Sequence, residues 1–229
     1  MTHPALALQD VRFRWPGRVS FGLSVPEFRM AAGESVLLLG ESGSGKSTLL
    51  SLICGIVVAD AGRVTIGDTD LSTLRAGARD RFRAERIGVI FQQFNLLPYA
   101  SVSDNILLPL RFAPERRKRA TADEAETLCA ALGLPEGVTG ATAGRLSVGQ
   151  QQRIAVARAL IGQPALIVAD EPTSALDAAT QDTFLGLLFE QIAATGSSLL
   201  MVSHDQRLGA RFDRVVNLSD IAHSERLPA

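Results

Sequence analysis

Apolar and polar residues alternate near the start of the chain, as expected for strands with one buried face. Residues 5–14 set Leu6, Leu8 and Val11 among polar neighbours, a spacing that predicts a β-strand. Residues 21–30 form a second extended stretch. The chain is therefore expected to open with a small antiparallel β lobe.

Further along, several short runs are apolar almost throughout, which is typical of strands buried on both faces of a sheet. They are residues 36–39, 87–91, 165–169 and 198–202. Two further strands are expected at residues 63–66 and 214–218, and a helix at residues 47–53. Because strands alternate with helical segments, the sheet is predicted to be mainly parallel.

Residues 93–160 differ in texture from the rest of the chain. Prolines punctuate helical stretches there, and no pattern of a buried strand occurs. We expect a helical lobe inserted into an α/β core. The predicted organisation is one domain over residues 1–229, with residues 1–92 and 161–229 forming the core and residues 93–160 the lobe.

Composition narrows the class of protein. A chain of 229 residues with 46% hydrophobic content can bury a large core. Its net charge of −1 carries no sign of nucleic-acid binding, and two cysteines form no disulfide framework. There is no signal-peptide pattern, and no apolar run approaches the roughly 18–20 residues that span a bilayer. We expect a soluble, cytoplasmic protein that meets a membrane only through a partner.

A basic run at residues 116–119 lies beside the acidic residues Glu115, Asp123 and Glu124. This mixture predicts a solvated helix face and argues against a nucleic-acid or lipid site. The arginines at positions 75, 79, 81, 83 and 86 receive the same interpretation. No nucleic acid is therefore expected among the partners.

One loop fits the phosphate-binding pattern G-x-x-x-x-G-K-[ST] and lies between a predicted strand and a predicted helix, as that pattern requires. It is Gly40-Glu41-Ser42-Gly43-Ser44-Gly45-Lys46-Ser47. Glycines let several backbone N–H groups face one phosphate chain. Lys46 is placed for the β- and γ-phosphates, and the Ser47 hydroxyl for Mg²⁺. The loop predicts a nucleotide binder with a P-loop NTPase core.

Acidic and basic groups follow two of the buried strands. Asp170 and Glu171 end the apolar run at residues 165–169, where Asp170 would reach the Mg²⁺ shell and Glu171 would polarise an attacking water as general base. His204 follows residues 198–202, at the end of a strand where ligands gather in open α/β sheets. A contact between His204 and the γ-phosphate is expected.

The run Leu146-Ser147-Val148-Gly149-Gln150-Gln151-Gln152-Arg153 predicts the start of a helix. The Ser147 hydroxyl is placed to cap the first turn, and Gln150 is placed to reach back as a capping box. The open amides of such a turn attract an anion. Since the chain already has one phosphate loop, this helix tip is expected to serve a nucleotide held by a second copy of the chain.

Two further residues complete the candidate site. Gln92 ends a buried strand, and its neutral amide could contact both Mg²⁺ and the attacking water. Trp15 is the only tryptophan. It either stacks on adenine or packs as an ordinary core residue beside Pro16.

Together these elements resemble the ATP-binding subunit of ABC transporters over nearly the whole chain. The resemblance identifies an aromatic loop at Trp15, Walker A at Gly40 to Thr48, a Q-loop at Gln92, a signature with Ser147, Gly149 and Gln150, Walker B at Asp170-Glu171, a D-loop at Ser174-Ala175-Leu176-Asp177, and a switch histidine at His204. It implies ATP and Mg²⁺, with Ser47, Gln92 and Asp170 around the metal and Glu171, His204 and Gln92 at the reaction.

Residues 91–98 and 104–110 are similar to a subgroup that includes lipoprotein-release, macrolide-export and FtsE-type ATPases. The resemblance implies a head-to-tail dimer, each ATP lying between one Walker A and the other chain's signature. It also implies an integral-membrane permease, reached through Gln92 and the apolar residues 94–99, and a place on the inner face of the membrane. The alternatives are a non-exporting FtsE-type regulator and a non-transport ABC ATPase of DNA repair or translation.

Two departures from the family pattern stand out. Val148 occupies a position that is usually glycine, which costs little if the backbone is helical there and weakens closure if φ is positive. The residues Asn217-Leu218-Ser219-Asp220 replace a common Asp-Gly turn. No function is attached to that replacement.

Overall fold

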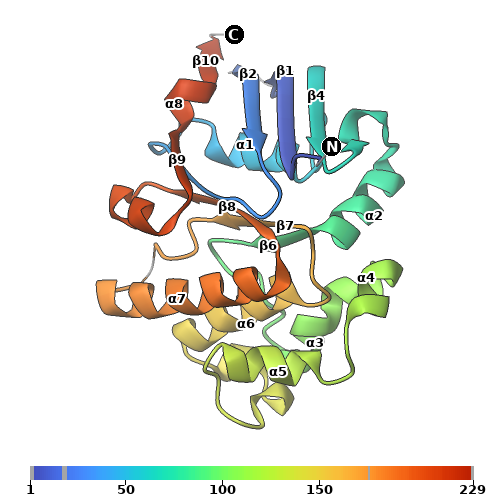
Figure 1. The fold of residues 1–229 in the computed structure, drawn as a ribbon, viewed down its shortest axis with the longest axis vertical. Helices are drawn as coiled ribbons and strands as arrows, with labels where there is room; N and C mark the ends of the chain where they lie inside the picture. The colour runs from blue at the N-terminus through green and yellow to red at the C-terminus, as the bar shows by residue number, and fades with distance from the viewer. Residues whose placement is uncertain (1–2, 17–19, 175, 228–229) are drawn as a thin grey trace. The chain divides into compact units, whose positions relative to one another are not determined.

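The computed structural model describes residues 3–16, 20–174 and 176–227. The chain divides into two compact units, one formed by Met1–Asp80 with Ser198–Ala229 and the other by Arg81–Ser197 (Figure 1). The segment predicted as a helical lobe, residues 93–160, lies wholly within the second unit.

The first unit contains an antiparallel sheet with the strand order β10-β2-β1-β4-β5. Its strands are β1 (Leu6–Arg14), β2 (Ser20–Met30), β4 (Ala61–Ile66), β5 (Thr69–Asp70) and β10 (His223–Leu227). The predicted alternation in β1 is confirmed, since Leu6, Leu8 and Val11 are fully buried. β10, which the sequence pattern did not indicate, pairs antiparallel with β2.

The first unit also contains three parallel strands in the order β8-β3-β9. They are β3 (Ser35–Leu39), β8 (Ser198–Ser203) and β9 (Arg214–Asn217). Leu39 is in register with Ser203 on one side and with Asn217 on the other. The three strands therefore end at one level, and the segments that follow them meet at the same sheet edge. Those segments include α1 (Lys46–Ile53) after β3, η5 (Gln206–Arg211) after β8 and α8 (Leu218–Ile221) after β9.

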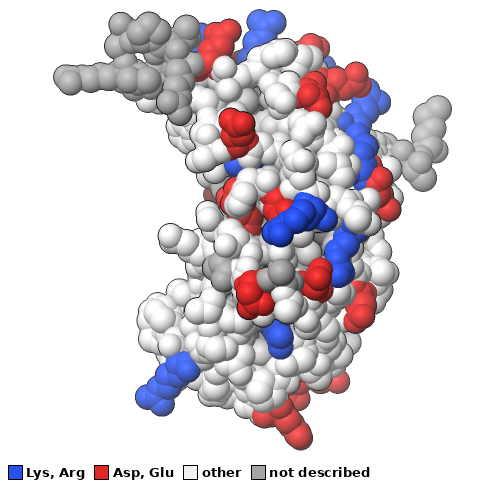
Figure 2. Space-filling view, turned by 90° about the vertical axis from the view of Figure 1, so that its left-hand side faces the viewer, with Lys and Arg blue, Asp and Glu red and all other residues white. Residues whose placement is uncertain are grey.

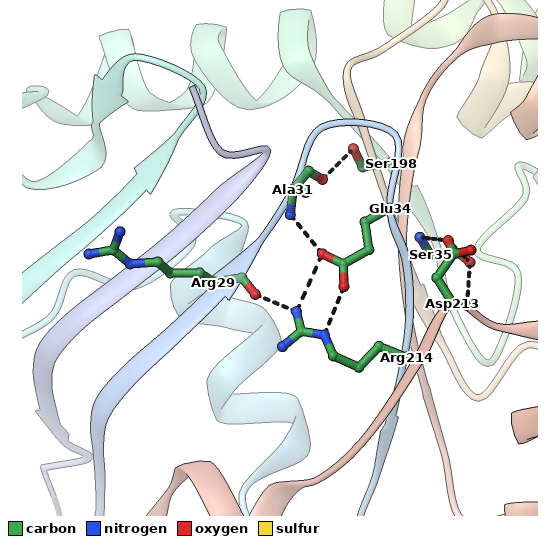
Figure 3. A network of polar contacts seen from close by, with 7 residues as sticks. All are labelled: Arg29, Ala31, Glu34, Ser35, Ser198, Asp213 and Arg214. Atoms are coloured by element: carbon green, nitrogen blue, oxygen red, sulfur yellow. Dashed lines mark hydrogen bonds and ion pairs between the residues drawn. The ribbon is translucent and has the colours of Figure 1, made fainter. Parts of the chain in front are cut away.

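A polar network holds the opposite ends of these strands (Figure 3). Arg214 Nε donates to Glu34 Oε1 at 2.7 Å, and a second nitrogen of Arg214 donates to the carbonyl oxygen of Arg29. Ser35 donates to Asp213 Oδ2 through its backbone N–H at 2.8 Å and its hydroxyl at 2.7 Å. The turn after β2 is thereby tied to the starts of β3 and β9.

Within the second unit, β6 (Ile87–Ile90) pairs parallel with β7 (Leu166–Asp170), with Ile90 opposite Ala169. The remaining elements are helical: α3 (Val102–Leu107), η2 (Leu108–Arg111), α4 (Pro114–Arg119), α5 (Glu124–Ala131), η3 (Val138–Gly140), η4 (Ala143–Arg145), α6 (Val148–Leu160) and α7 (Ala178–Thr195). α6 contacts α3, α5 and α7 (Figure 1). η1 (Leu71–Thr73) and α2 (Ala76–Arg86) connect β5 to β6.

The basic run at residues 116–119 is not a uniformly solvated face. Arg116 is only 1% exposed, and its guanidinium donates to the carbonyl oxygens of Ala84, Ile87, Ala159 and Ile161. Burial lowers the pKa of Arg116 to about 10, so the group stays charged at neutral pH. The prediction was wrong for Arg116 because a sequence pattern cannot show that four carbonyl groups converge on one side chain.

Charges of both signs are interspersed on the face drawn in Figure 2. On that face, the described residues form no broad surface of one sign. None of the helices in the described ranges is long and apolar enough to cross a bilayer.

Candidate nucleotide site

The phosphate-binding loop lies where its sequence predicts, between β3 and α1. Gly43 and Gly45 have φ values of +79° and +108°, in the region that favours glycine. Where residues with positive φ alternate with residues of negative φ, successive backbone N–H groups point to one side and form a concave site for an anion. A Cβ on Gly45 would also lie 3.0 Å from the Phe21 ring. Both the turn and the neighbouring β2 therefore require glycine at position 45.

Lys46 is the first residue of α1 and is almost wholly buried. Its Nζ donates to the carbonyl oxygens of Gly40 at 2.6 Å and Glu41 at 2.8 Å. These bonds hold the ammonium group against the loop. Ser47, the next residue, is exposed at the first turn of the helix. The cationic side chain and the hydroxyl thus lie in the first turn of α1, directly after the loop.

Trp15 lies at the end of β1 and contacts this same helix. Its indole Nε1 donates to Thr48 Oγ1 at 3.0 Å, and its ring meets Phe13 edge-on with 5.0 Å between centroids. Trp15 as a residue remains 40% exposed. Trp15 is therefore both packed and open to solvent, beside the helix that carries the loop.

A hollow of about 460 Å³ lies at the level where β3, β8 and β9 end. His204 lines it together with the loop residues Gly40, Glu41 and Ser44. The prediction that His204 follows a strand at the ligand edge of the sheet agrees with this placement. The first unit thus brings the histidine and the loop together.

The hollow is also lined by Asn217, Leu218 and Ser219. A Cβ on Gly40 would lie 3.3 Å from Leu218 Cβ, so the start of α8 packs directly on the loop. Sequence reasoning attached no function to this segment. Only the register of β9 beside β3 could have placed it here.

The second unit brings Gln92, Asp170 and Glu171 to one sheet edge. β6 and β7 are parallel neighbours. Gln92 follows β6, Asp170 is the last residue of β7, and Glu171 follows it directly. Glu171 has a φ of +42°, which is uncommon for a residue other than glycine. Such backbone strain persists where the surroundings hold it and clusters at functional sites.

Ser147 caps α6 as predicted. Gln150 N–H donates to Ser147 Oγ at 3.3 Å, and Ser147 N–H donates to Gln150 Oε1 at 3.0 Å, which is a complete capping box. The capping interaction fixes the direction in which the first turn of the helix presents its N–H groups.

Val148, which departs from the family pattern, occupies a helical position that accommodates valine. Val148 is the first residue of α6, has no positive φ, and is 55% exposed. A β-branched residue fits a helical backbone at small cost. Around Gly149, a Cβ would meet nothing within 4 Å. The surface beside Gly149 is therefore open for an approaching group.

Two side chains of α6 contact other parts of the site, and the sequence analysis missed both. Arg158 Nη1 donates to the carbonyl oxygen of Asn95 at 2.6 Å, in the turn after Gln92, where Phe94 and Asn95 both have positive φ. Burial lowers the pKa of Arg158. Gln152 is 1% exposed and its Nε2 donates to the carbonyl oxygen of Pro172. No local signal separates Gln152 from the neighbouring glutamines.

Asp177, the last residue of the predicted D-loop, caps α7. Its Oδ1 accepts from the Thr180 N–H at 3.0 Å, and hydrogen bonds from Thr180 lower its pKa. Ser174 and Leu176 belong to the turns before this helix. Ala175 lies outside the described residues.

Comparison with known proteins agrees with this geometry. The profile of the ABC transporter family matches residues 23–174. The lipoprotein-releasing system ATP-binding protein LolD of Ruegeria sp. is 41% identical over 211 residues, covering 92% of each chain. The macrolide export ATP-binding/permease protein MacB of Hyphomonas neptunium is 39% identical over 226 residues. That alignment covers 96% of this chain and 34% of MacB, so the chain spans about a third of that protein.

Solved structures give the same result. The ATP-binding cassette MJ0796, in a dimeric post-hydrolysis state bound to ADP and Pi, superposes with a TM-score of 0.81 and 33% identity. The match covers 98% of this chain and 99% of that one. The glycine-rich loop before α1, the capped helix that begins at Ser147 and the family match over most of the chain agree: the chain belongs to the ABC transporter ATP-binding family.

Proposed function

We propose that this chain binds and hydrolyses ATP as the ATP-binding subunit of an ABC transporter. The observation that carries the proposal is the hollow that His204 lines together with the loop residues Gly40, Glu41 and Ser44. There, backbone N–H groups and Lys46 would bind the β- and γ-phosphates, and His204 would contact the γ-phosphate. Trp15 would stack on adenine.

Glu171 is proposed as the general base that takes a proton from the attacking water, with Gln92 orienting that water. Ser47, Gln92 and Asp170 would supply oxygen ligands of the kind that Mg²⁺ prefers, and this ion usually keeps water and phosphate oxygens as its other ligands. The described residues hold no cluster of three or more His, Cys, Asp or Glu for a metal. When bound, Mg²⁺ would neutralise phosphate charge.

The proposed partners, a second copy of the chain and a membrane permease, are inferred from the N-terminal end of α6 at Ser147. In a head-to-tail dimer, Ser147 and the Gly149 N–H of one copy would bind the γ-phosphate held by the other copy. Hydrogen bonds to charged groups contribute about 1.5–3 kcal/mol each. Loss of the γ-phosphate would therefore favour opening, and the apolar segment 94–99 would pass the change to an integral-membrane permease. The subunit would lie at the inner face of the membrane through that permease.

The sharpest test compares Lys46→Ala with Glu171→Gln. Lys46→Ala should lose ATP binding or turnover, whereas Glu171→Gln should bind ATP, stall hydrolysis and accumulate dimers, measured by phosphate release and size-exclusion chromatography. Removal of a comparable catalytic group usually costs at least ~10²-fold in rate. Normal turnover by either variant would contradict the role given to that residue.

A further inference from the structure

Gln152 is a buried amide on the signature helix. It lies five residues after Ser147 in α6, is 1% exposed, and donates through Nε2 to the carbonyl oxygen of Pro172. By contrast, the adjacent Gln151 donates to the carbonyl of Leu146, a residue of its own segment. Gln152 therefore makes the link from this helix to the end of β7.

The segment that Gln152 holds begins with the proposed general base. Pro172 follows Glu171, whose φ is +42°. Thr173 is 4% exposed, and its Oγ1 accepts from Gln181 Nε2 of α7 at 3.0 Å. The strained turn after β7 is thus held by an amide from α6 at Pro172 and by an amide from α7 at Thr173. Strain of this kind persists only where neighbouring structure fixes it.

We infer that Gln152 is a positioning residue, which places the Glu171 carboxylate by holding the backbone of Pro172. In this role Gln152 acts through the turn that carries the base, by its hydrogen bond to the carbonyl oxygen of Pro172. The inference rests on the proposed role of Glu171. If Gln152 has this role, the helix that begins at Ser147 also positions the Walker B residue Glu171 in its own chain.

This link has a consequence in the proposed head-to-tail dimer. There, Ser147 of one chain serves the ATP bound by the other chain, while Glu171 of the same chain serves its own ATP. The bond between Gln152 and Pro172 lies between these two groups. A movement of α6 on binding of one ATP would therefore be passed through this bond to the base at the other ATP.

Gln152→Met tests the inference, because methionine keeps the size of the side chain and removes the donor. We expect kcat for ATP hydrolysis to fall about 10-fold or more, since a displacement of 1 Å in a reacting group costs about 10²-fold. KM for ATP should stay near the wild-type value, whereas the thermal unfolding midpoint should fall by a few degrees, because the buried carbonyl of Pro172 loses its donor. Gln191→Met, a half-buried glutamine on α7 in the same unit, is the matched control and should leave kcat unchanged.

The double variant Gln152→Met with Glu171→Gln distinguishes a role of Gln152 in positioning Glu171 from a role in packing alone. If Gln152 acts through Glu171, adding Gln152→Met to Glu171→Gln should lower the residual turnover no further. An additional fall by the factor seen in the single variant would overturn the inference. If Gln152→Met does not fold, Gln152→Asn keeps the amide but shortens it, and the same kinetic result is expected.

The remaining outcomes are also decisive. Unchanged kcat in Gln152→Met, with Glu171→Gln stalled, would overturn the positioning role and leave the proposed function intact. A parallel loss of nucleotide binding and turnover in both Gln152 variants would make Gln152 a structural residue only. If Glu171→Gln hydrolyses ATP at the wild-type rate, the role of Glu171 is wrong and the inference about Gln152 falls with it.

Discussion

The indole nitrogen of Trp15 lies 3.0 Å from the hydroxyl oxygen of Thr48, on the helix that begins at the phosphate-binding loop. The bond joins the end of β1 to the third residue of α1. Because the residue is also 40% exposed, the only tryptophan of the chain is joined to the helix after the loop and is open to solvent.

ATP should therefore change the fluorescence of Trp15. Stacking on adenine, or a shift of α1 on binding, alters the surroundings of the indole. Titration with ATP at equilibrium measures the effect, and Lys46→Ala, which should not bind, is the control. A silent Trp15 in a protein that demonstrably binds ATP would favour the packing role alone.

Restoring glycine at Val148 should alter ATPase activity little. The position is the first residue of α6 and is exposed, so valine imposes no strained backbone there, and glycine should lower helix stability by less than the roughly 1 kcal/mol that it costs in a helix interior. Steady-state phosphate release measures the rate. A large gain in rate would instead identify Val148 as a brake on closure.

Gly149→Ala should lower ATPase activity, in contrast to the substitution of glycine for Val148. A Cβ at this position meets nothing within 4 Å of its own chain, so the variant should fold with an unchanged or slightly higher unfolding midpoint. If a second copy delivers its γ-phosphate there, turnover should nevertheless fall. Equal activity of Gly149→Ala and the wild type would contradict the shared site.

Arg116 should be among the costliest side chains to remove from the second unit. Arg116→Met leaves four carbonyl oxygens without this donor, at about 1–3 kcal/mol for each buried group left unpaired. We expect the free energy of unfolding to fall by about 3 kcal/mol or more in urea denaturation. Arg117→Met, at an exposed neighbour, should change it by less than about 0.5 kcal/mol.

Asp213 should make stability depend on pH in the acid range. Hydrogen bonds from the hydroxyl and N–H of Ser35 lower the pKa of its carboxyl group below the unfolded value of about 3.9. Its contribution is therefore complete above that value and is lost as pH falls through the folded pKa. Urea midpoints of wild type and Asp213→Asn should differ at pH 7, and the difference should shrink as pH falls below about 4; a constant difference would exclude this origin.

Cys129 should resist alkylation in the folded protein. It is 3% exposed, and burial raises the pKa of its thiol to about 11, so the reactive thiolate is scarce at neutral pH. Mass spectrometry after iodoacetamide treatment at pH 8 should find Cys129 unmodified until urea is added. Rapid labelling of the native protein would show that the helices around it open readily.

The strands and the loop were predicted well because their signals are local. Alternating residues mark β1, apolar runs mark β3, β7 and β8, and glycine spacing marks the phosphate loop. The capping box at Ser147 was equally accessible, since both of its bonds join residues three apart. β10 was missed because an edge strand paired only with β2 needs no apolar pattern.

By itself, the sequence determined the chemical groups of the site and the elements that carry them, since each motif is complete within a few consecutive residues. Only the tertiary structure decided that Arg116 is buried, that Leu218 packs on Gly40, and that Gln152 holds Pro172. These contacts join residues far apart in the chain. They depend on the register and packing of whole elements, and no short pattern encodes them.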